Sequence, residues 1–104
     1  MRISITLFVI LFLSVSVSAQ TQSSWTGSGS DDGWSTPQNW NPEIKPDNDD
    51  MNTFDVFMDA ATTDLSENIT ISSLVMGQGS AGGTTINGGG QTLIVEGPLT
   101  VDIG

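Results

Sequence analysis

Apolar and polar residues alternate along much of the second half of the chain. Leu99, Val101 and Ile103 are separated by polar residues, and Ile69 and Ile71 flank a threonine. A period of two is typical of a β-strand with one buried face, and glycines close these short segments. The pattern predicts an all-β fold, and no segment after residue 19 requires a helix.

The clearest single strand is expected over Asn52–Asp59. Its apolar positions on one face are Phe54, Val56 and Met58, and the opposite positions are Thr53, Asp55, Phe57 and Asp59. Phe57 on the second face predicts that this face is partly covered. The residues from 60 to 68 are mostly polar and are interpreted as a link without regular structure.

A repeat is also visible. Leu74 and Met76 lie nineteen positions before Leu93 and Val95, and a glycine follows each pair within two residues. Self-similarity at about twenty residues favours a solenoid, in which each coil buries its face against the next coil. We therefore expect Leu93 and Val95 to repeat Leu74 and Met76 in stacked rungs.

The residues from 25 to 50 have a different character, because Gly, Ser, Asn, Asp and Pro dominate and favour turns. Trp25, Trp34 and Trp40 punctuate this stretch. Large indoles need burial, which predicts a small cap that packs on the first coil. The alternative is an exposed platform for stacking sugars, but spacings of nine and six residues do not place the three rings on one strand face. Residues 20–24 are expected to be a mobile polar leader.

The first nineteen residues have the layout of a secretory signal peptide. Arg2 precedes an apolar run, and Val17-Ser18-Ala19 is an acceptable cleavage site. The apolar core from Ile5 to Leu13 is shorter than the roughly 20 residues that a membrane-spanning helix needs. The predicted organisation is a signal peptide over 1–19, a Trp-rich cap with the first strand over 20–59, and solenoid rungs over 60–104. Secretion to the medium or the cell surface follows from this organisation.

Charge narrows the range of partners. The chain has 12 acidic residues and a formal net charge of −10, and Lys45 is the single base after Arg2. Clustered Lys and Arg are needed to bind nucleic acid or an anionic membrane, so neither partner is expected. The chain has no cysteine, so stability must come from further coils, a partner or a metal rather than disulfides. Strand-like residues near the end predict either continuation of the solenoid or self-association.

Candidate chemistry is sparse. His, Cys and Tyr are absent, which excludes nucleophilic triads and zinc sites and leaves only carboxylate-based hydrolysis conceivable. No catalytic residue and no cofactor are predicted. Asp47, Asp49 and Asp50 are candidate calcium ligands, although the order of an EF-hand loop is absent. Asn68 begins an Asn-Ile-Thr glycosylation pattern.

One constellation of residues is similar to a known module. In order, it comprises Trp25-Thr26-Gly27, Asp32-Gly33-Trp34, Pro37-Xaa-Asn39-Trp40, Pro46 and Thr53-Phe54-Asp55-Val56. It resembles the N-terminal module of exported bacterial β-helix proteins of the autotransporter-passenger and adhesin-like type. The resemblance implies a right-handed parallel β-helix closed by a Trp-rich segment, a cell-surface setting, extracellular glycans or cell-surface components as partners, and no shared catalytic residues.

The expected function is therefore a non-catalytic structural or adhesive segment at the N-terminal end of a larger surface protein. Two alternatives stay open. One is a carbohydrate-binding module that uses the three Trp residues, and the other is the N-terminal piece of a polysaccharide-degrading enzyme.

Overall fold

The computed structural model describes residues 19–59, 61–77 and 83–101, and within them the chain is all-β apart from one short 3-10 helix. The elements are β1 (Ala19–Trp25), η1 (Pro37–Asn39), β2 (Trp40–Asn41), β3 (Asn52–Asp59), β4 (Thr62–Asp64), β5 (Ile69–Ile71), β6 (Ser73–Gly77), β7 (Thr85–Asn87), β8 (Leu93–Val95) and β9 (Leu99–Val101). The expected signal peptide lies outside the described residues except for Ala19. No helix in these ranges is long and apolar enough to cross a membrane.

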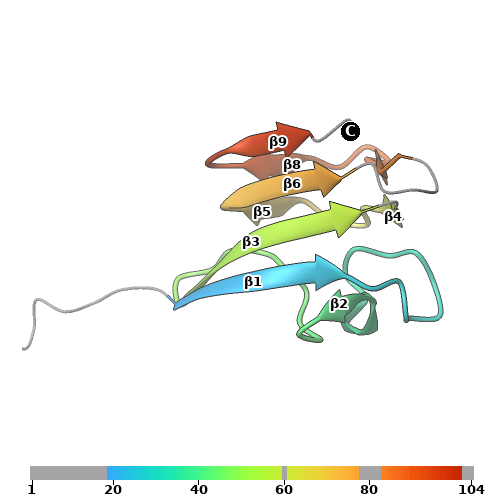
Figure 1. Cartoon of the computed structure of the whole chain (residues 1–104), viewed down its shortest axis with the longest axis horizontal. Helices are drawn as coiled ribbons and strands as arrows, with labels where there is room; N and C mark the ends of the chain where they lie inside the picture. The colour runs from blue at the N-terminus through green and yellow to red at the C-terminus, as the bar shows by residue number, and fades with distance from the viewer. Residues whose placement is uncertain (1–18, 60, 78–82, 102–104) are drawn as a thin grey trace, which may run out of the picture.

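The largest sheet has five strands in the order β2-β1-β3-β6-β9 (Figure 1). Only β2 runs antiparallel to its neighbour, while β1, β3, β6 and β9 form a continuous parallel ladder. Two further parallel pairs, β4–β7 and β5–β8, form two-stranded sheets. Parallel strands need crossover connections, and here the segments between β3, β6 and β9 supply them by contributing the strands of the two small sheets.

The core lies between these sheets. Its buried apolar side chains are Trp34, Trp40, Phe54, Val56, Met58, Ala61, Leu65, Ile69, Ile71 and Leu74. β3 and β5 contribute alternate positions to this core, as the pleat of a strand requires. The core is therefore continuous from the Trp-rich segment to β6.

The strand predicted over Asn52–Asp59 is confirmed with the same bounds as β3. Phe54, Val56 and Met58 are buried. On the opposite face Phe57 is 45% exposed, so its side chain is only partly covered. β1 and β6 lie beside β3 in the same sheet, and Ser24 and Val75 flank this ring in the ladder.

Residues 20–24 were predicted to be a mobile leader, and that prediction is wrong. They belong to β1, which pairs in parallel with β3 from Ala19 opposite Asn52 to Ser24 opposite Phe57. The other side of β1 pairs with β2 at Ser24 and Trp25. A polar strand is stable here because backbone hydrogen bonds hold it, to β3 along most of its length and to β2 at its end.

The link expected over residues 60–68 also contains regular structure. Thr62–Asp64 forms β4, and Ala61, Thr63 and Leu65 are buried. The Thr63 hydroxyl donates to the carbonyl oxygen of Asp32 at 2.8 Å, which satisfies this polar group inside the protein. The segment is a core element and not a solvated connection.

The repeat predicted from Leu74 and Leu93 has a different register in the structure. Leu74 lies opposite Leu99 and Met76 opposite Val101, whereas Leu93 lies opposite Ile69. In each small sheet a side-chain hydrogen bond shows the spacing between paired segments. Asn87 bonds Asp64, 23 positions earlier, and Thr92 bonds Asn68, 24 positions earlier. The nineteen-residue similarity relates strands of two different sheets, since β5 and β6 carry the same apolar alternation.

Candidate functional site

The three indoles meet where β1, β2 and the loop before η1 come together. The ring centroids of Trp34 and Trp40 are 4.8 Å apart at an interplanar angle of 61°, and those of Trp25 and Trp40 are 5.1 Å apart at 85°. Both pairs are edge-to-face, the arrangement that places a positive ring edge on a negative ring face. Trp40 is therefore the centre of a three-ring cluster.

Two indole N–H groups of this cluster are satisfied by backbone. Nε1 of Trp34 donates to the carbonyl oxygen of Pro46 at 2.8 Å, and Nε1 of Trp40 donates to the carbonyl oxygen of Trp34 at 2.7 Å. Both side chains are buried, with exposures of 0% and 1%. Burial of an indole is favourable when its N–H finds a partner, as both do here.

Asn39 organises the loop that carries the indoles. Its Nδ2 donates to the carbonyl oxygens of Asp31 and Gly33 at 2.9 and 3.0 Å, and its Oδ1 accepts from the backbone N–H of Gly29 at 2.7 Å. The side chain is fully buried. One amide thus satisfies three backbone groups in a segment that lacks regular structure, which is how an irregular loop becomes fixed.

This geometry bears on the sugar platform considered for Trp25, Trp34 and Trp40. Trp34 and Trp40 offer no surface to a ligand, because both are buried. Trp25 is half-buried and packs edge-to-face on Trp40. The structure places these rings in the core at one end of the parallel ladder, where β2 covers β1.

The candidate calcium ligands Asp47, Asp49 and Asp50 lie in one loop, but two of them are bonded to protein groups. Oδ1 of Asp49 accepts the backbone N–H groups of Met51 and Asn52, both at 2.8 Å. These two bonds lower the pKa of Asp49 below its ordinary value of 3.8. Within residues 19–59, 61–77 and 83–101, no three carboxylates come together in a group suited to a metal ion.

Asp47 joins this loop to strand β5. Its Oδ1 accepts the backbone N–H of Thr70 at 3.0 Å, and its Oδ2 lies 3.7 Å from Nζ of Lys45. Lys45 also donates to Glu67 at 3.1 Å. The hydroxyl of Ser35 and then Lys45 lower the pKa of Glu67, because both bonds favour the charged carboxylate.

Asn48 forms hydrogen bonds to separate segments of the chain. Its Oδ1 accepts the backbone N–H of Phe54 at 2.8 Å, while its Nδ2 donates to the Ser72 hydroxyl at 3.1 Å and to Glu96 at 3.3 Å. Its own N–H donates to the carbonyl oxygen of Thr70 at 2.7 Å. Asp47 and Asn48 therefore form a corner that is hydrogen-bonded to later strands, and Asp49 holds the turn before β3.

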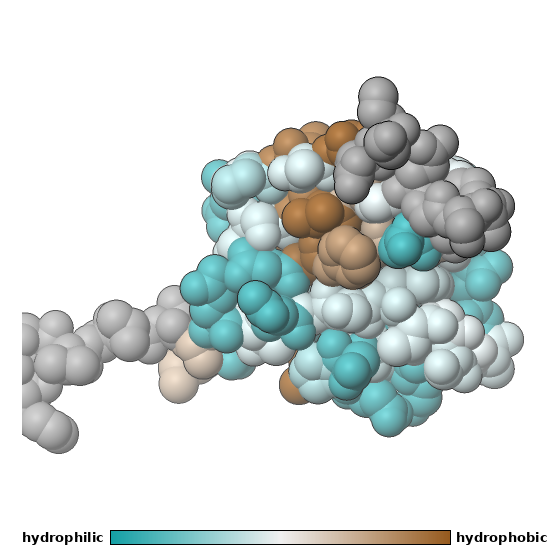
Figure 2. Space-filling model, in the orientation of Figure 1, coloured by the Kyte–Doolittle hydropathy of each residue, from teal (hydrophilic) through white to brown (hydrophobic). Residues whose placement is uncertain are grey.

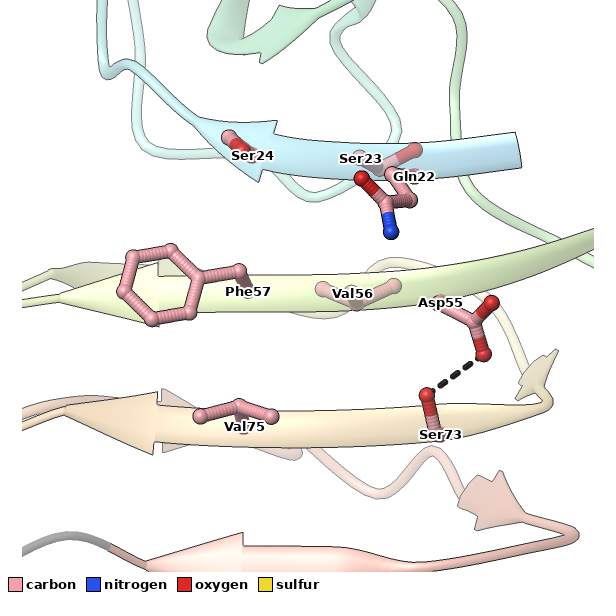
Figure 3. Close-up of a pocket in the computed structure, with 8 residues that line it drawn as sticks. All are labelled: Gln22, Ser23, Ser24, Asp55, Val56, Phe57, Ser73 and Val75. Carbon is pink, nitrogen blue, oxygen red and sulfur yellow. Dashed lines mark hydrogen bonds between the residues drawn. The ribbon is translucent and has the colours of Figure 1, made fainter.

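The outward face of the large sheet carries a shallow depression over β1, β3 and β6. The residues that line it are Gln22, Ser23, Ser24, Asp55, Val56, Phe57, Ser73 and Val75 (Figure 3). In the space-filling view, an apolar patch lies in the middle of this face, with polar residues below it and further apolar residues at the upper edge (Figure 2). Phe57 is the large exposed aromatic ring of this surface.

Hydrogen bonds across the strands order this face. The Ser73 hydroxyl donates to Oδ1 of Asp55 at 2.6 Å (Figure 3), and Nε2 of Gln20 donates to its Oδ2. Gln22, Asp55 and Ser73 occupy one row of the ladder, and Ser24, Phe57 and Val75 occupy the next row. The face is a fixed array of polar groups beside an aromatic ring.

The end of the ladder at β9 differs from the end at β2. Leu99 and Val101 are 59% and 58% exposed, although their register partners Leu74 and Met76 belong to the core or pack against it. On the described chain no strand lies beyond β9 in this sheet. The two ends of the parallel ladder are thus chemically different.

Sequence reasoning identified the indoles and the acidic loop but missed the outward face. The signal was the alternation of Asp55, Phe57 and Asp59, which assigns an aromatic ring and two carboxylates to one side of a strand. The polar sequence of β1 gave no comparable signal, so the depression over β1 and β3 was not foreseeable. No protein-family model, curated protein or solved structure matches this chain.

Proposed function

We propose that this chain is the N-terminal capping segment of a right-handed parallel β-helix that is exported to the medium or the cell surface and acts as a non-catalytic structural or adhesive element. The observation that supports this most strongly is the difference between the two ends of the parallel ladder. One end is covered by β2 and the indole cluster, while the other exposes Leu99 and Val101.

A solenoid needs this kind of asymmetry at its first coil. Internal coils bury their faces on both neighbours, so a terminal coil requires a different element that closes one side only. The buried rings of Trp34 and Trp40 supply such a closure through packing and through their backbone hydrogen bonds. The apolar positions on β9 are suited to stacking of a further coil.

The signal peptide predicted over residues 1–19 supports export. A mechanical role is supported by the hydrogen bonds of Asn48, which join three separate segments of the chain at Phe54, Ser72 and Glu96. A stack of this kind is stiff along its axis, because β1, β3 and β6 each pair with a strand on both sides. Adhesion then depends on what the outward faces bind.

The native product tests the proposal. An antibody against residues 20–59 would capture it from the culture medium, the cell envelope and the cytoplasm. We expect it outside the cytoplasm, with an intact mass well above the 10.9 kDa of this chain. A cytoplasmic product with the mass of this chain would contradict the proposal.

The stacking register has its own test by NMR on the labelled chain. We expect side-chain contacts between Leu74 and Leu99 and between Ile69 and Leu93. Absence of both contacts in the folded chain would contradict the parallel stack.

The open end is testable by sedimentation. We expect the chain to self-associate with rising concentration and expect Val101→Glu to abolish this association. Thr100 lies on the other face of β9, so Thr100→Glu is the matched control and should leave the association unchanged.

A further inference from the structure

Phe57 lies between two carboxylates on the outward face of β3. Asp55, Phe57 and Asp59 are alternate residues of this strand, so their side chains project to the same side at intervals of about 7 Å. Asp59 and Phe57 are exposed, and Asp55 is half-buried. The face therefore presents an aromatic ring in a negative field.

The carboxylate of Asp55 is held in place before any ligand arrives. Ser73 on β6 donates to one of its oxygens and Gln20 on β1 donates to the other. Each oxygen keeps a free lone pair, because a carboxylate accepts about four hydrogen bonds in total. A group fixed in this way loses little conformational entropy when it binds.

The position opposite Asp59 is Gly77 on β6. A Cβ atom at Gly77 would lie 3.1 Å from Oδ1 of Asp59. The glycine thus leaves space around this carboxylate. The neighbouring outward positions bring hydroxyl and amide groups from Gln22, Ser24 and Ser73, and an apolar side chain from Val75, which lies opposite Phe57 on β6 (Figure 3).

No positive charge balances these carboxylates on this face of the described chain. Lys45, the single basic residue in those ranges, pairs with Glu67 and Asp47 in a different loop. The negative face of an aromatic ring attracts cations, and the attraction grows with carboxylates nearby. The chemistry that complements this surface is an organic ammonium group.

The shape of the surface favours a polymer of sugars over a peptide. The depression is open and extends over three paired strands. Because these strands pair with one another here, they offer no free backbone edge to which a peptide could add as a strand. The hydroxyl and amide groups beside Phe57 instead match the hydroxyl groups of a saccharide, and the ring matches the C–H face of a pyranose.

We propose that the outward face of β1, β3 and β6 binds a polysaccharide that carries free amino groups. Phe57 stacks on a sugar ring, and Asp55 and Asp59 bind the ammonium groups. The sugar hydroxyls form hydrogen bonds with the side chains of Gln22, Ser24 and Ser73. This inference does not depend on the capping role of the indoles, since the two surfaces use different residues.

Calorimetric titration of the purified chain with a glucosamine hexamer tests the proposal in a mildly acidic buffer that keeps the amines protonated. We expect binding that weakens as salt is added, because the charged groups are near the surface. The N-acetylated hexamer and a glucose hexamer of the same linkage should bind at least roughly tenfold more weakly. An oligolysine of the same charge separates amino sugar recognition from simple attraction of cations.

Variants locate the site. We expect Phe57→Ala to weaken binding by roughly fivefold to tenfold, in the range of a cation–aromatic contact. The double change Asp55→Asn and Asp59→Asn should weaken binding further and remove its dependence on salt. Asp50→Asn and Met51→Ala are the matched controls, since both residues are exposed and precede β3, and both should bind as the unaltered chain does.

The melting temperature of every variant shows whether folding is retained. Three results would overturn the proposal. They are no binding of the glucosamine hexamer by the folded chain, binding of oligolysine or the uncharged hexamers with equal affinity, and a loss on Asp50→Asn as large as that on the paired change.

Discussion

The indole N–H of Trp40 donates to the backbone carbonyl oxygen of Trp34, with the two atoms 2.7 Å apart. The same two rings meet edge-to-face, with centroids 4.8 Å apart. One residue pair therefore combines packing and a satisfied buried polar group. This pair fixes the path of the turn-rich segment against the end of the sheet, which is the basis of the proposed capping role.

The change Trp40→Ala should lower the free energy of unfolding by about 3–5 kcal/mol. It removes a buried aromatic ring, leaves a cavity and frees the carbonyl oxygen of Trp34. Chemical denaturation monitored by circular dichroism measures this. The exposed Ile44 provides the control, since Ile44→Ala should cost less than about 0.5 kcal/mol. A cost for Trp40→Ala as small as the control would show that the ring does not support the fold.

The change Asn39→Asp keeps the shape of the side chain but replaces its donor. In the unaltered chain, Nδ2 of Asn39 donates to the carbonyl oxygens of Asp31 and Gly33. In the variant, a carboxylate oxygen takes its place and would repel both. We expect a loss of at least about 2 kcal/mol. Thermal unfolding measures the effect, with the exposed Asn41→Asp as its control. Equal melting temperatures for the two variants would refute the organising role of Asn39.

Ser23 is an expected site of stabilisation. Its hydroxyl oxygen is buried and has no hydrogen-bond partner within the described residues. Removing an unsatisfied buried polar group should raise the free energy of unfolding, so Ser23→Ala is predicted to stabilise the fold by about 1 kcal/mol. Its neighbour Ser24 is exposed, and Ser24→Ala should change stability by less than about 0.5 kcal/mol. Destabilisation by Ser23→Ala would mean that the hydroxyl has a partner in solution.

Two glycines should respond differently to the same substitution. A Cβ atom at Gly97 would lie 2.5 Å from the carbonyl oxygen of Ser72, whereas one at Gly83 would meet no atom of the described residues within 4 Å. Gly97→Ala forces two backbone segments apart and should cost about 1–3 kcal/mol. Gly83→Ala should change stability by less than about 0.5 kcal/mol. Denaturant midpoints compare the two, and equal midpoints would contradict the close approach of the turn before β9 to Ser72.

Acid should destabilise the fold through carboxylates whose pKa is lowered. Hydrogen bonds from Thr36 and Gly33 lower the pKa of Asp31 below 3.8, and those from Ser35 and Lys45 lower the pKa of Glu67 below 4.5. A lowered pKa in the folded state gives stability that is complete above the ordinary value and is lost as pH falls through the folded-state pKa. The melting temperature should therefore fall on acidification below these ordinary values.

The variant Glu67→Gln tests the sign of this effect. It should melt lower than the unaltered chain at neutral pH and lose less on acidification, because its contribution is already absent. The exposed Glu43→Gln is the control and should show the full loss. A melting temperature of the unaltered chain that rises on acidification would contradict the assignment.

The parts of the fold that the sequence predicts are those in which apolar side chains alone specify the structure. The bounds of β3 follow from the alternation of Phe54, Val56 and Met58, and burial of Trp34 and Trp40 follows from their size and the turn-rich residues around them. In these places a large apolar side chain has one favourable environment, so local pattern and final structure agree.

The parts that sequence reasoning missed depend on partners distant in the chain. β1 is polar and is held by β2 and β3, so nothing in its own residues indicates a strand. Thr63 lies in the core because its hydroxyl reaches the carbonyl oxygen of Asp32. The register of Leu93 was also unpredictable, since β5 and β6 offer it the same apolar alternation and only the connecting turns distinguish them.

The candidate sites also divide into those visible in the local sequence and those that depend on residues distant in the chain. The acidic loop was noticed because its residues cluster in sequence, but its role in the structure is to hold backbone groups of Met51, Asn52 and Thr70. The outward face around Phe57 needed the pairing of three strands to become visible.

Segment-resolved hydrogen exchange on the unaltered chain and on Trp40→Ala tests most directly whether the indole cluster caps the parallel stack. If it does, each strand depends on its neighbour, so the substitution should accelerate exchange in β1, in β3 and then in β6. Faster exchange confined to residues 25–41, with β3 and β6 unchanged, would contradict the capping role.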